Sequence, residues 1–156
     1  MQKKCEMTPD EFKKKLQKQR QALAQAYART LPVKVGTEAV HFVRDNFKQE
    51  GFVDEHLEPW KPAKRKSNPK HPDQAYKTLS SRRRNLYMSV KKRTKPGVAI
   101  IYSDVPYAAA HNEGTNNAGR GHKTRIPKRQ FIGESRTLNK KAKKIIEDEL
   151  KRIMND

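Results

Sequence analysis

Apolar residues recur at helical spacing in three segments of this 156-residue chain, and these segments limit the possible folds. A spacing of three or four residues gathers side chains on one helix face, which must then pack on another element. The pattern predicts helices over residues 8–30, 33–49 and 136–154. Their apolar stripes are Phe12, Leu16, Leu23 and Tyr27, then Val35, Ala39, Phe42, Val43 and Phe47, and finally Leu138, Ala142, Ile145, Ile146, Leu150 and Ile153.

Local signals mark the ends of the first two helices. Thr8 suits the N-cap, Pro9 suits the first helical position, and Glu11 completes a capping box. Leu31-Pro32 is expected to break or kink the first helix, because proline has no N–H and clashes with the preceding turn. Gly51 is placed to end the second helix.

The segment between the second and last predicted helices carries strand and turn signals. Leu86, Met88 and Val90 alternate with polar residues, which indicates a strand. Lys95-Pro96-Gly97 is typical of a turn between that strand and a buried one. The expected elements in chain order are a helical turn through Arg82, Arg83 and Arg84 capped by Ser80 or Ser81, strands at 86–90 and 98–102 forming an antiparallel hairpin, a short helix at 106–111, a polar loop at 115–122 and a third strand within 123–128.

Residues 52–78 show no apolar periodicity. Four prolines alternate with lysine and arginine here, and the segment also holds Trp60. We expect an extended, mobile loop. The predicted fold is therefore α+β, with two N-terminal helices and a C-terminal helix packed on a small antiparallel sheet, and with long basic loops. It forms one domain over residues 1–156, comprising N-terminal helices at 1–51, the loop at 52–78, the sheet region at 79–133 and the last helix at 134–156.

The composition predicts a small core and a basic surface. Hydrophobic residues make up 33% of the chain and charged residues 34%, so either a partner buries further apolar surface or the domain is modest with disordered ends. The net charge is +19, and residues 61–95 hold 13 Lys and Arg against one acidic residue, Asp73. The single cysteine, Cys5, has no partner for an internal disulfide, which fits a cytoplasmic, reducing compartment. Neither a transmembrane run nor a secretory signal is evident.

A basic cluster in the middle of the chain is the candidate for contact with DNA or with an acidic partner. Its members are Arg82, Arg83, Arg84, Lys91, Lys92 and Arg93. Such side chains can neutralise phosphates, although a solvated basic face, or one matched to an acidic protein ring, has the same composition. Both interpretations remain open at this point.

Motifs for catalysis or metal binding have no support. His111, Glu113 and His122 lack the spacing of a metal site, and Cys5 is the only thiol, so we expect no catalytic residues, no metal and no cofactor. We expect His111 to have a hydrogen-bonding role at a helix end. Tyr107 and Phe131 are most simply core residues. Arg129 stands beside Phe131 and is expected to pair with a carboxylate of a neighbouring subunit, to form an intrachain salt bridge, or to be exposed.

Four segments together resemble the phage virion morphogenesis proteins, also called tail-completion or neck proteins. The most specific is Ile126-Pro127, Arg129, Phe131 and Gly133, and the others are Tyr107-Ala108 with His111 and Gly114, Trp60 with Pro62, and Leu86 with Ser89-Val90. The similarity covers about residues 58–154. The Thr-Gly pair of the family's second segment is missing here, where Ser80-Ser81 stands nearest.

The resemblance implies an α+β fold and a ring, commonly of six copies, at the virion neck or the tail end, assembled in the host cytoplasm. The implied partners are other copies of the chain, phage connector and tail proteins, and passing DNA through non-specific contact, with no membrane. Tyr107, Arg129, Phe131 and Trp60 are the candidate interface residues. We hypothesise a structural protein of tail completion or head–tail joining. The alternatives are a small nucleic-acid-binding protein that uses residues 61–95 and, with less support, a metal-dependent nuclease.

Overall fold

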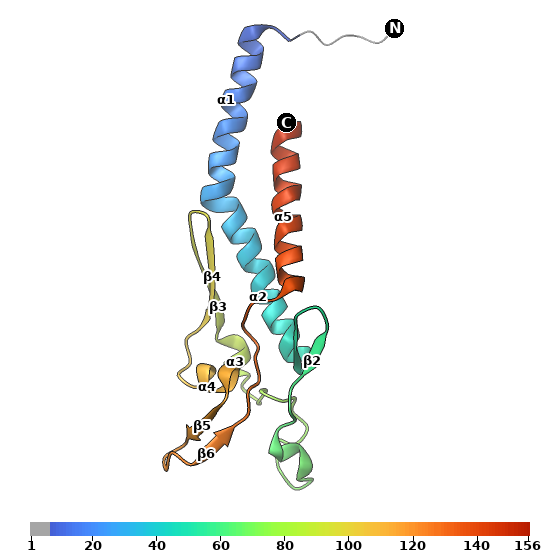
Figure 1. Ribbon diagram of the computed structural model, residues 1–156, viewed down its shortest axis with the longest axis vertical. Coiled ribbons are helices and arrows are strands. Elements are labelled where there is room, and N and C mark those ends of the chain that lie inside the picture. Colours follow the sequence, from blue (N-terminus) through green and yellow to red (C-terminus); the bar gives the residue numbers. More distant parts are fainter. Residues whose placement is uncertain (1–6) are drawn as a thin grey trace.

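The computed structural model describes residues 7–156, and its long helices form an elongated rod (Figure 1). Helix α1 (Pro9–Gln25) passes through the π-helical turn η1 (Ala26–Thr30) into helix α2 (Leu31–Gln49). Helix α5 (Arg136–Asn155) runs back beside α2 and contacts α1 as well. The predicted α+β class is confirmed, but the strands form three separate two-stranded antiparallel sheets instead of one.

The start of α1 confirms the predicted capping box. Thr8 Oγ1 accepts from the Glu11 N–H, while Glu11 Oε2 accepts from the Thr8 N–H at 2.8 Å. Of the two outcomes expected at Leu31-Pro32, a break or a kink, the kink is confirmed: the helix changes direction through the π-helical turn without ending (Figure 1).

The π-helical turn leaves one backbone carbonyl without an intrahelical partner, and a β-hairpin binds to it. The Leu31 N–H donates to Ala26 O, five residues back, and the corresponding donor for Tyr27 O would be Pro32, which has none. The Gly97 N–H donates a hydrogen bond to Tyr27 O at 3.0 Å. The tip of a β-hairpin is thereby held against the bend between α1 and α2.

Helix α2 ends at Gln49, as predicted, but its C-cap differs from the predicted one. Glu50, not Gly51, adopts the left-handed conformation at the C-cap, with φ 54°. Gly51 instead begins strand β1 (Gly51–Val53), which pairs with β2 (Leu57–Pro59). The Glu50 carboxylate accepts from Lys66 Nζ and from the Thr78 N–H, and these bonds hold the segment in place.

Residues 52–78 are more structured than the sequence suggested. Besides β1 and β2 they contain a 3₁₀ turn, η2 (Lys64–Ser67). Arg65 organises the segment by donating to backbone carbonyls of Asp73, Lys77 and Ser80. The sequence predicted an extended, mobile loop here and did not indicate these short elements, because hydrogen bonds between side chains and distant carbonyls produce no apolar periodicity.

The strand predicted at 86–90 is wrong. Helix α3 (Asn85–Met88) occupies this place, and strand β3 (Val90–Lys95) follows it. Leu86 and Val90 are buried while Met88 is exposed, so a spacing of four, not two, decides which side chains enter the core.

The predicted hairpin turn at Pro96-Gly97 is confirmed, because Lys95 of β3 pairs with Val98 of β4 (Val98–Ser103). However, β4 is not a buried strand. Val98 and Ile100 remain exposed, since α2 covers only one face of the hairpin. Gly36 allows the hairpin to pack closely on α2, because a Cβ at this position would lie 3.2 Å from the Lys92 side chain.

The last part of the sheet region also differs in detail. Helix α4 (Ala108–Glu113) begins two residues later than expected. The predicted polar loop contains strand β5 (Thr115–Ala118). The predicted third strand exists as β6 (Thr124–Ile126), but it pairs with β5 instead of joining the hairpin.

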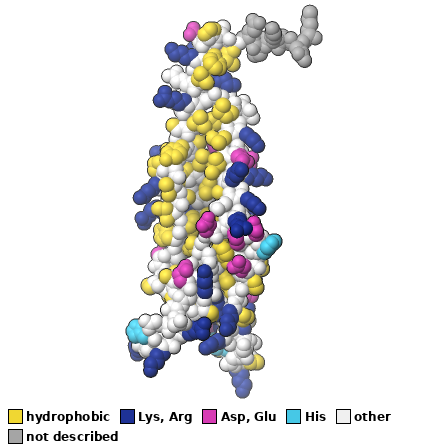
Figure 2. All heavy atoms as spheres, viewed as in Figure 1, with side chains coloured by type: hydrophobic (Ala, Val, Ile, Leu, Met, Phe, Trp, Pro, Cys, Tyr) yellow, Lys and Arg dark blue, Asp and Glu magenta, His cyan; other side chains and the backbone are white. Residues whose placement is uncertain are grey.

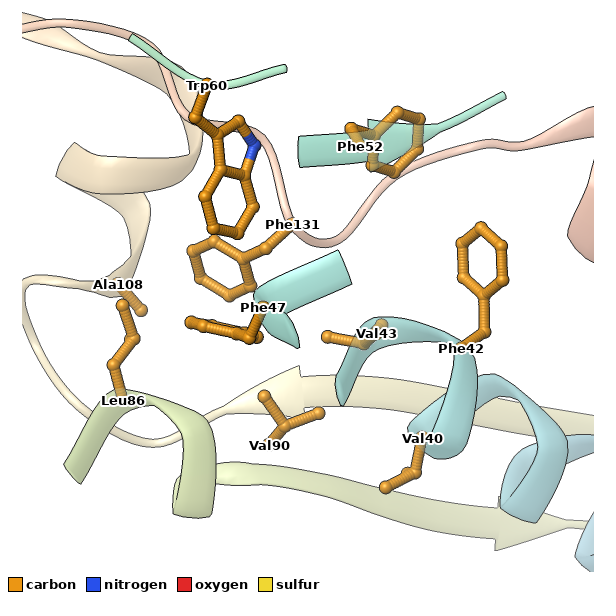
Figure 3. Packing of buried hydrophobic residues seen from close by; sticks show 10 residues of the cluster. All are labelled: Val40, Phe42, Val43, Phe47, Phe52, Trp60, Leu86, Val90, Ala108 and Phe131. Carbon is orange, nitrogen blue, oxygen red and sulfur yellow. The ribbon is translucent and has the colours of Figure 1, made fainter. Parts of the chain in front are cut away.

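The hydrophobic core lies around the C-terminal half of α2. Figure 3 shows Phe131 placed between Trp60 and Phe47, with ring centroids of Phe47 and Phe131 5.1 Å apart. The core joins α2, β1, α3, β3, α4 and the segment before α5. Its buried members are Val40, Phe42, Val43, Phe47, Phe52, Trp60, Leu86, Val90, Ala108 and Phe131.

Candidate functional site: an apolar face and a basic end

The predicted apolar stripe of the first helix is present but largely uncovered. Phe12 is 55% exposed, Leu16 50% and Tyr27 61%, and Leu23 is also exposed. Helix α1 projects past the end of α5, so its first turns have no neighbouring element among the described residues (Figure 1). We call these four residues, together with Ile146 and Leu150 of α5, the apolar face.

The apolar face continues into a hollow where the bend of the helix meets the hairpin tip and α5. This hollow has a volume of about 220 Å³, and Tyr27, Pro32, Ala99 and Ile146 contribute to its lining. Figure 2 shows hydrophobic side chains in a strip along the upper half of the molecule. Burying one large apolar side chain contributes about 1.5–3 kcal/mol, so four half-exposed ones leave roughly 3–6 kcal/mol available to a partner.

The six predicted basic contact residues do not form one free surface. Lys91 pairs with Asp104, and Lys92 donates to Val33 O and to Thr37 on α2. Arg93 lies over the Tyr102 ring, with its guanidinium carbon 5.6 Å from the ring centre. Arg82, Arg83 and Arg84 share one exposed turn before α3, and Arg84 also lies over Tyr87.

Three of the four candidate interface residues are buried within the subunit. Phe131 is a core residue, as predicted, and Trp60 donates its Nε1–H to Gln130 O at 2.7 Å. Tyr107 is 42% exposed, so the prediction of a core position was wrong for it. Tyr107 is thus the one member of the four whose side chain a neighbouring subunit can reach directly.

Arg129 is 7% exposed and joins two distant segments of the chain. Its Nε donates to Lys61 O at 2.8 Å and its Nη2 donates to Pro62 O at 3.2 Å. Within residues 7–156 it forms no ion pair, so the prediction of an intrachain salt bridge is wrong. Its burial shows that the alternative prediction, an exposed side chain, is also wrong. The pKa of Arg129 is lowered by burial and then by the charge of Arg65.

Two asparagines that the sequence reasoning missed, buried Asn46 and partly buried Asn112, position Phe131. Asn112 Oδ1 accepts from the N–H groups of Phe131 and Ile132, at 2.9 and 3.0 Å. Asn46 donates to Phe131 O and accepts from the Val53 N–H, both at 3.2 Å. Asn112 stands between His111 and Glu113, and that triplet invited only a metal interpretation. A polar residue within the apolar stripe of 33–49 was the available signal for Asn46.

His111 has the predicted helix-end role through its backbone only. Its carbonyl accepts from the Arg129 N–H at 2.8 Å, while its buried Nδ1 has no hydrogen-bond partner among the described residues. Burial and the charge of Arg129 lower the pKa of His111.

The part of the chain that the structure describes contains neither a candidate metal site nor a membrane-spanning helix. Residues 7–156 contain no group of three His, Cys, Asp or Glu side chains arranged for a metal ion. None of the helices within this range is long and apolar enough to cross a membrane. Cys5 lies outside the described residues.

Comparison with known proteins identifies the kind of protein. The model of the phage virion morphogenesis family matches residues 10–151, which is nearly the whole chain. Neither the curated proteins nor the solved structures gave a match. The match includes the N-terminal helices, which the recognised motifs did not cover, and it indicates a structural or assembly role in the virion. This chain belongs to the phage virion morphogenesis family.

Proposed function

We propose that this protein is a ring subunit that completes the phage tail or joins the tail to the head, without catalysis. The exposed apolar face carries the proposal. An amphipathic helix that projects from its own subunit is stabilised when another surface covers its apolar stripe. The occupant we infer is a second copy of the chain.

The arrangement favours a ring over a symmetric dimer. In a ring, one surface of each copy contacts a different surface of the next copy. The projecting end of α1 offers one such surface, and the face of the hairpin that α2 does not cover, with exposed Val98 and Ile100, offers another. We infer that the first turns of α1 pack against the hairpin side of the adjacent copy.

The charge of the chain determines how salt acts on this contact. Each copy carries +19, so neighbouring copies repel at low ionic strength, and screening by salt favours their association. DNA binding responds in the opposite direction, because added salt weakens phosphate contacts. Salt therefore separates a ring subunit from the alternative, a nucleic-acid-binding module that uses residues 61–95.

The other parts of the proposal concern location and partners. In the neck or at the tail end, the ring contacts connector and tail proteins, and its basic surface faces passing DNA or acidic subunits. Figure 2 shows many Lys and Arg side chains at the lower end of the molecule, away from the hydrophobic strip. Assembly takes place in the host cytoplasm.

Light scattering after size exclusion tests the proposal, at about 0.1 and 0.5 M salt, with and without a short duplex. We expect a discrete oligomer that forms without DNA and is more populated at the higher salt. The variant Leu16→Ser/Leu23→Ser should dissociate it, whereas the control Lys13→Ser/Lys14→Ser, on the same helix, should not. A monomer that shifts only with duplex, and only at low salt, would establish the nucleic-acid-binding alternative.

A further inference from the structure

Within residues 7–156, Arg65 and Arg129 form no ion pair with an acidic side chain. Arg129 is buried, yet its guanidinium bonds only to the carbonyls of Lys61 and Pro62. Arg65 likewise donates only to backbone carbonyls. Buried charges in proteins are normally paired with an opposite charge, so buried Arg129, with partly buried Arg65 beside it, leaves an anion-binding position open.

The first of two hollows beside these arginines is lined by groups that donate to oxyanions. It has a volume of about 230 Å³, and its polar lining comprises Arg65, Arg129, Ser80, Ser81, His111 and Tyr107. The buried His111 Nδ1 is without a partner among the described residues. An oxyanion bound here would offset the repulsion from Arg129 and allow a protonated Nδ1 to donate.

The second hollow shares Arg129 with the first and is also basic. It measures about 460 Å³, and its lining includes Arg129, Lys61, Lys64, Arg125 and Lys128. None of these five residues forms an ion pair within residues 7–156. Among the residues that the structure describes, no Asp or Glu lines either hollow.

We propose that the two hollows that share Arg129 bind successive phosphates of a duplex DNA backbone. A single small anion would occupy one hollow and leave the other uncompensated, whereas a polymer with a charge on every unit supplies both. Duplex DNA carries one negative charge per about 1.7 Å of its axis, which suits six clustered cations. An acidic peptide would need consecutive Asp or Glu residues to match this density.

The site differs from the basic cluster that the sequence suggested. Its cations come from residues 61–65 and 125–129, which Arg129 ties together, and neither Arg82–Arg84 nor β3 lines it. Only the choice of ligand rests on the proposed function, because a ring in the neck would meet the duplex DNA that passes through it. The site itself lies within one subunit and does not require a closed ring.

Fluorescence anisotropy with a labelled duplex tests the site, using the exposed pair Lys64→Ser/Lys128→Ser. Each phosphate contact contributes about 0.9 to the slope of log affinity against log salt. Losing one contact therefore weakens binding about eightfold at 0.1 M salt. The pair should therefore lower the slope by about 2 and weaken binding roughly 60-fold. The control Arg82→Ser/Arg83→Ser removes the same charge outside the hollows and should bind nearly as the unaltered protein does.

The outcomes separate the site from general electrostatics and from the ring. Equal losses in the two variants would overturn the proposal, because they would show attraction by net charge alone. Displacement of the duplex by polyglutamate of equal total charge, at equal or lower concentration, would also overturn it in favour of an acidic protein partner. Inorganic phosphate at constant ionic strength should compete only weakly. Light scattering on the same samples reports the oligomer, so loss of DNA binding with an intact oligomer leaves the ring unaffected.

Discussion

Replacing Asn46 with alanine should remove a large part of the stability of the fold. Asn46 is 0% exposed, and its side chain bonds to Phe131 O and to the Val53 N–H. Alanine leaves both backbone groups buried without a partner, and each such group costs about 1–3 kcal/mol. The expected loss is therefore about 2–6 kcal/mol, against a total stability of about 5–15 kcal/mol for a domain.

Urea unfolding followed by fluorescence measures this loss directly. Trp60 is the only tryptophan, and its ring centre lies 5.6 Å from that of Phe47 in the same core. Asn116→Ala is the matched control, because Asn116 is exposed and surface substitutions usually change stability by less than about 0.5 kcal/mol. A loss below about 1 kcal/mol for Asn46→Ala, with an unchanged dependence on urea, would refute the reasoning.

Three further predictions concern the rod and its attachments. Hydrogen bonds from Arg152 and then Lys34 lower the pKa of Glu149 from 4.5 to about 2, so its contribution to stability is complete above pH 4.5 and is lost as the pH falls toward 2. In Glu149→Gln, urea midpoints should be lower at neutral pH and should change less over that range; equal pH dependence in both proteins would contradict this assignment. Gly97→Ala should cost about 1–2 kcal/mol through its φ of 70°, and more through a Cβ 2.5 Å from the Tyr27 ring. Adding Tyr27→Ala should recover only the second part of that loss in thermal unfolding. Thr8→Ala, whose cap is worth about 1 kcal/mol, should reduce helicity by circular dichroism and speed amide exchange in the first turn of α1, with little effect on global unfolding. An equal shift of the global unfolding midpoint would show that the start of α1 belongs to the cooperative core.

The helices were predictable because their signals are local. The capping box of Thr8 and Glu11, the apolar stripes and the hairpin turn at Pro96-Gly97 depend on residues within a few positions of one another. Family membership followed from short motifs for the same reason, and the family model extends it over residues 10–151.

The candidate sites were less predictable, because their contacts join segments far apart in the chain. Asn46 and Phe131 are 85 positions apart, and Arg129 and Lys61 are 68 apart. Such pairs carry no periodic signal. Short segments also fit more than one period, and Leu86 to Val90 illustrates this, because burial against α2 selected the helical spacing over the alternating one.

Local chemistry therefore determined the helices, the hairpin turn, the positive charge and the family. Only the tertiary structure decided which apolar and basic side chains stay uncovered. Phe12 and Phe47 stand in similar amphipathic patterns, but α1 projects past α5 while the core closes around α2, so the first remains exposed and the second is buried. The same holds for charge, since Lys92 packs on α2 whereas Arg129 meets two backbone carbonyls. Exposure depends on what the rest of the chain places beside a residue, and that is a property of the packed whole.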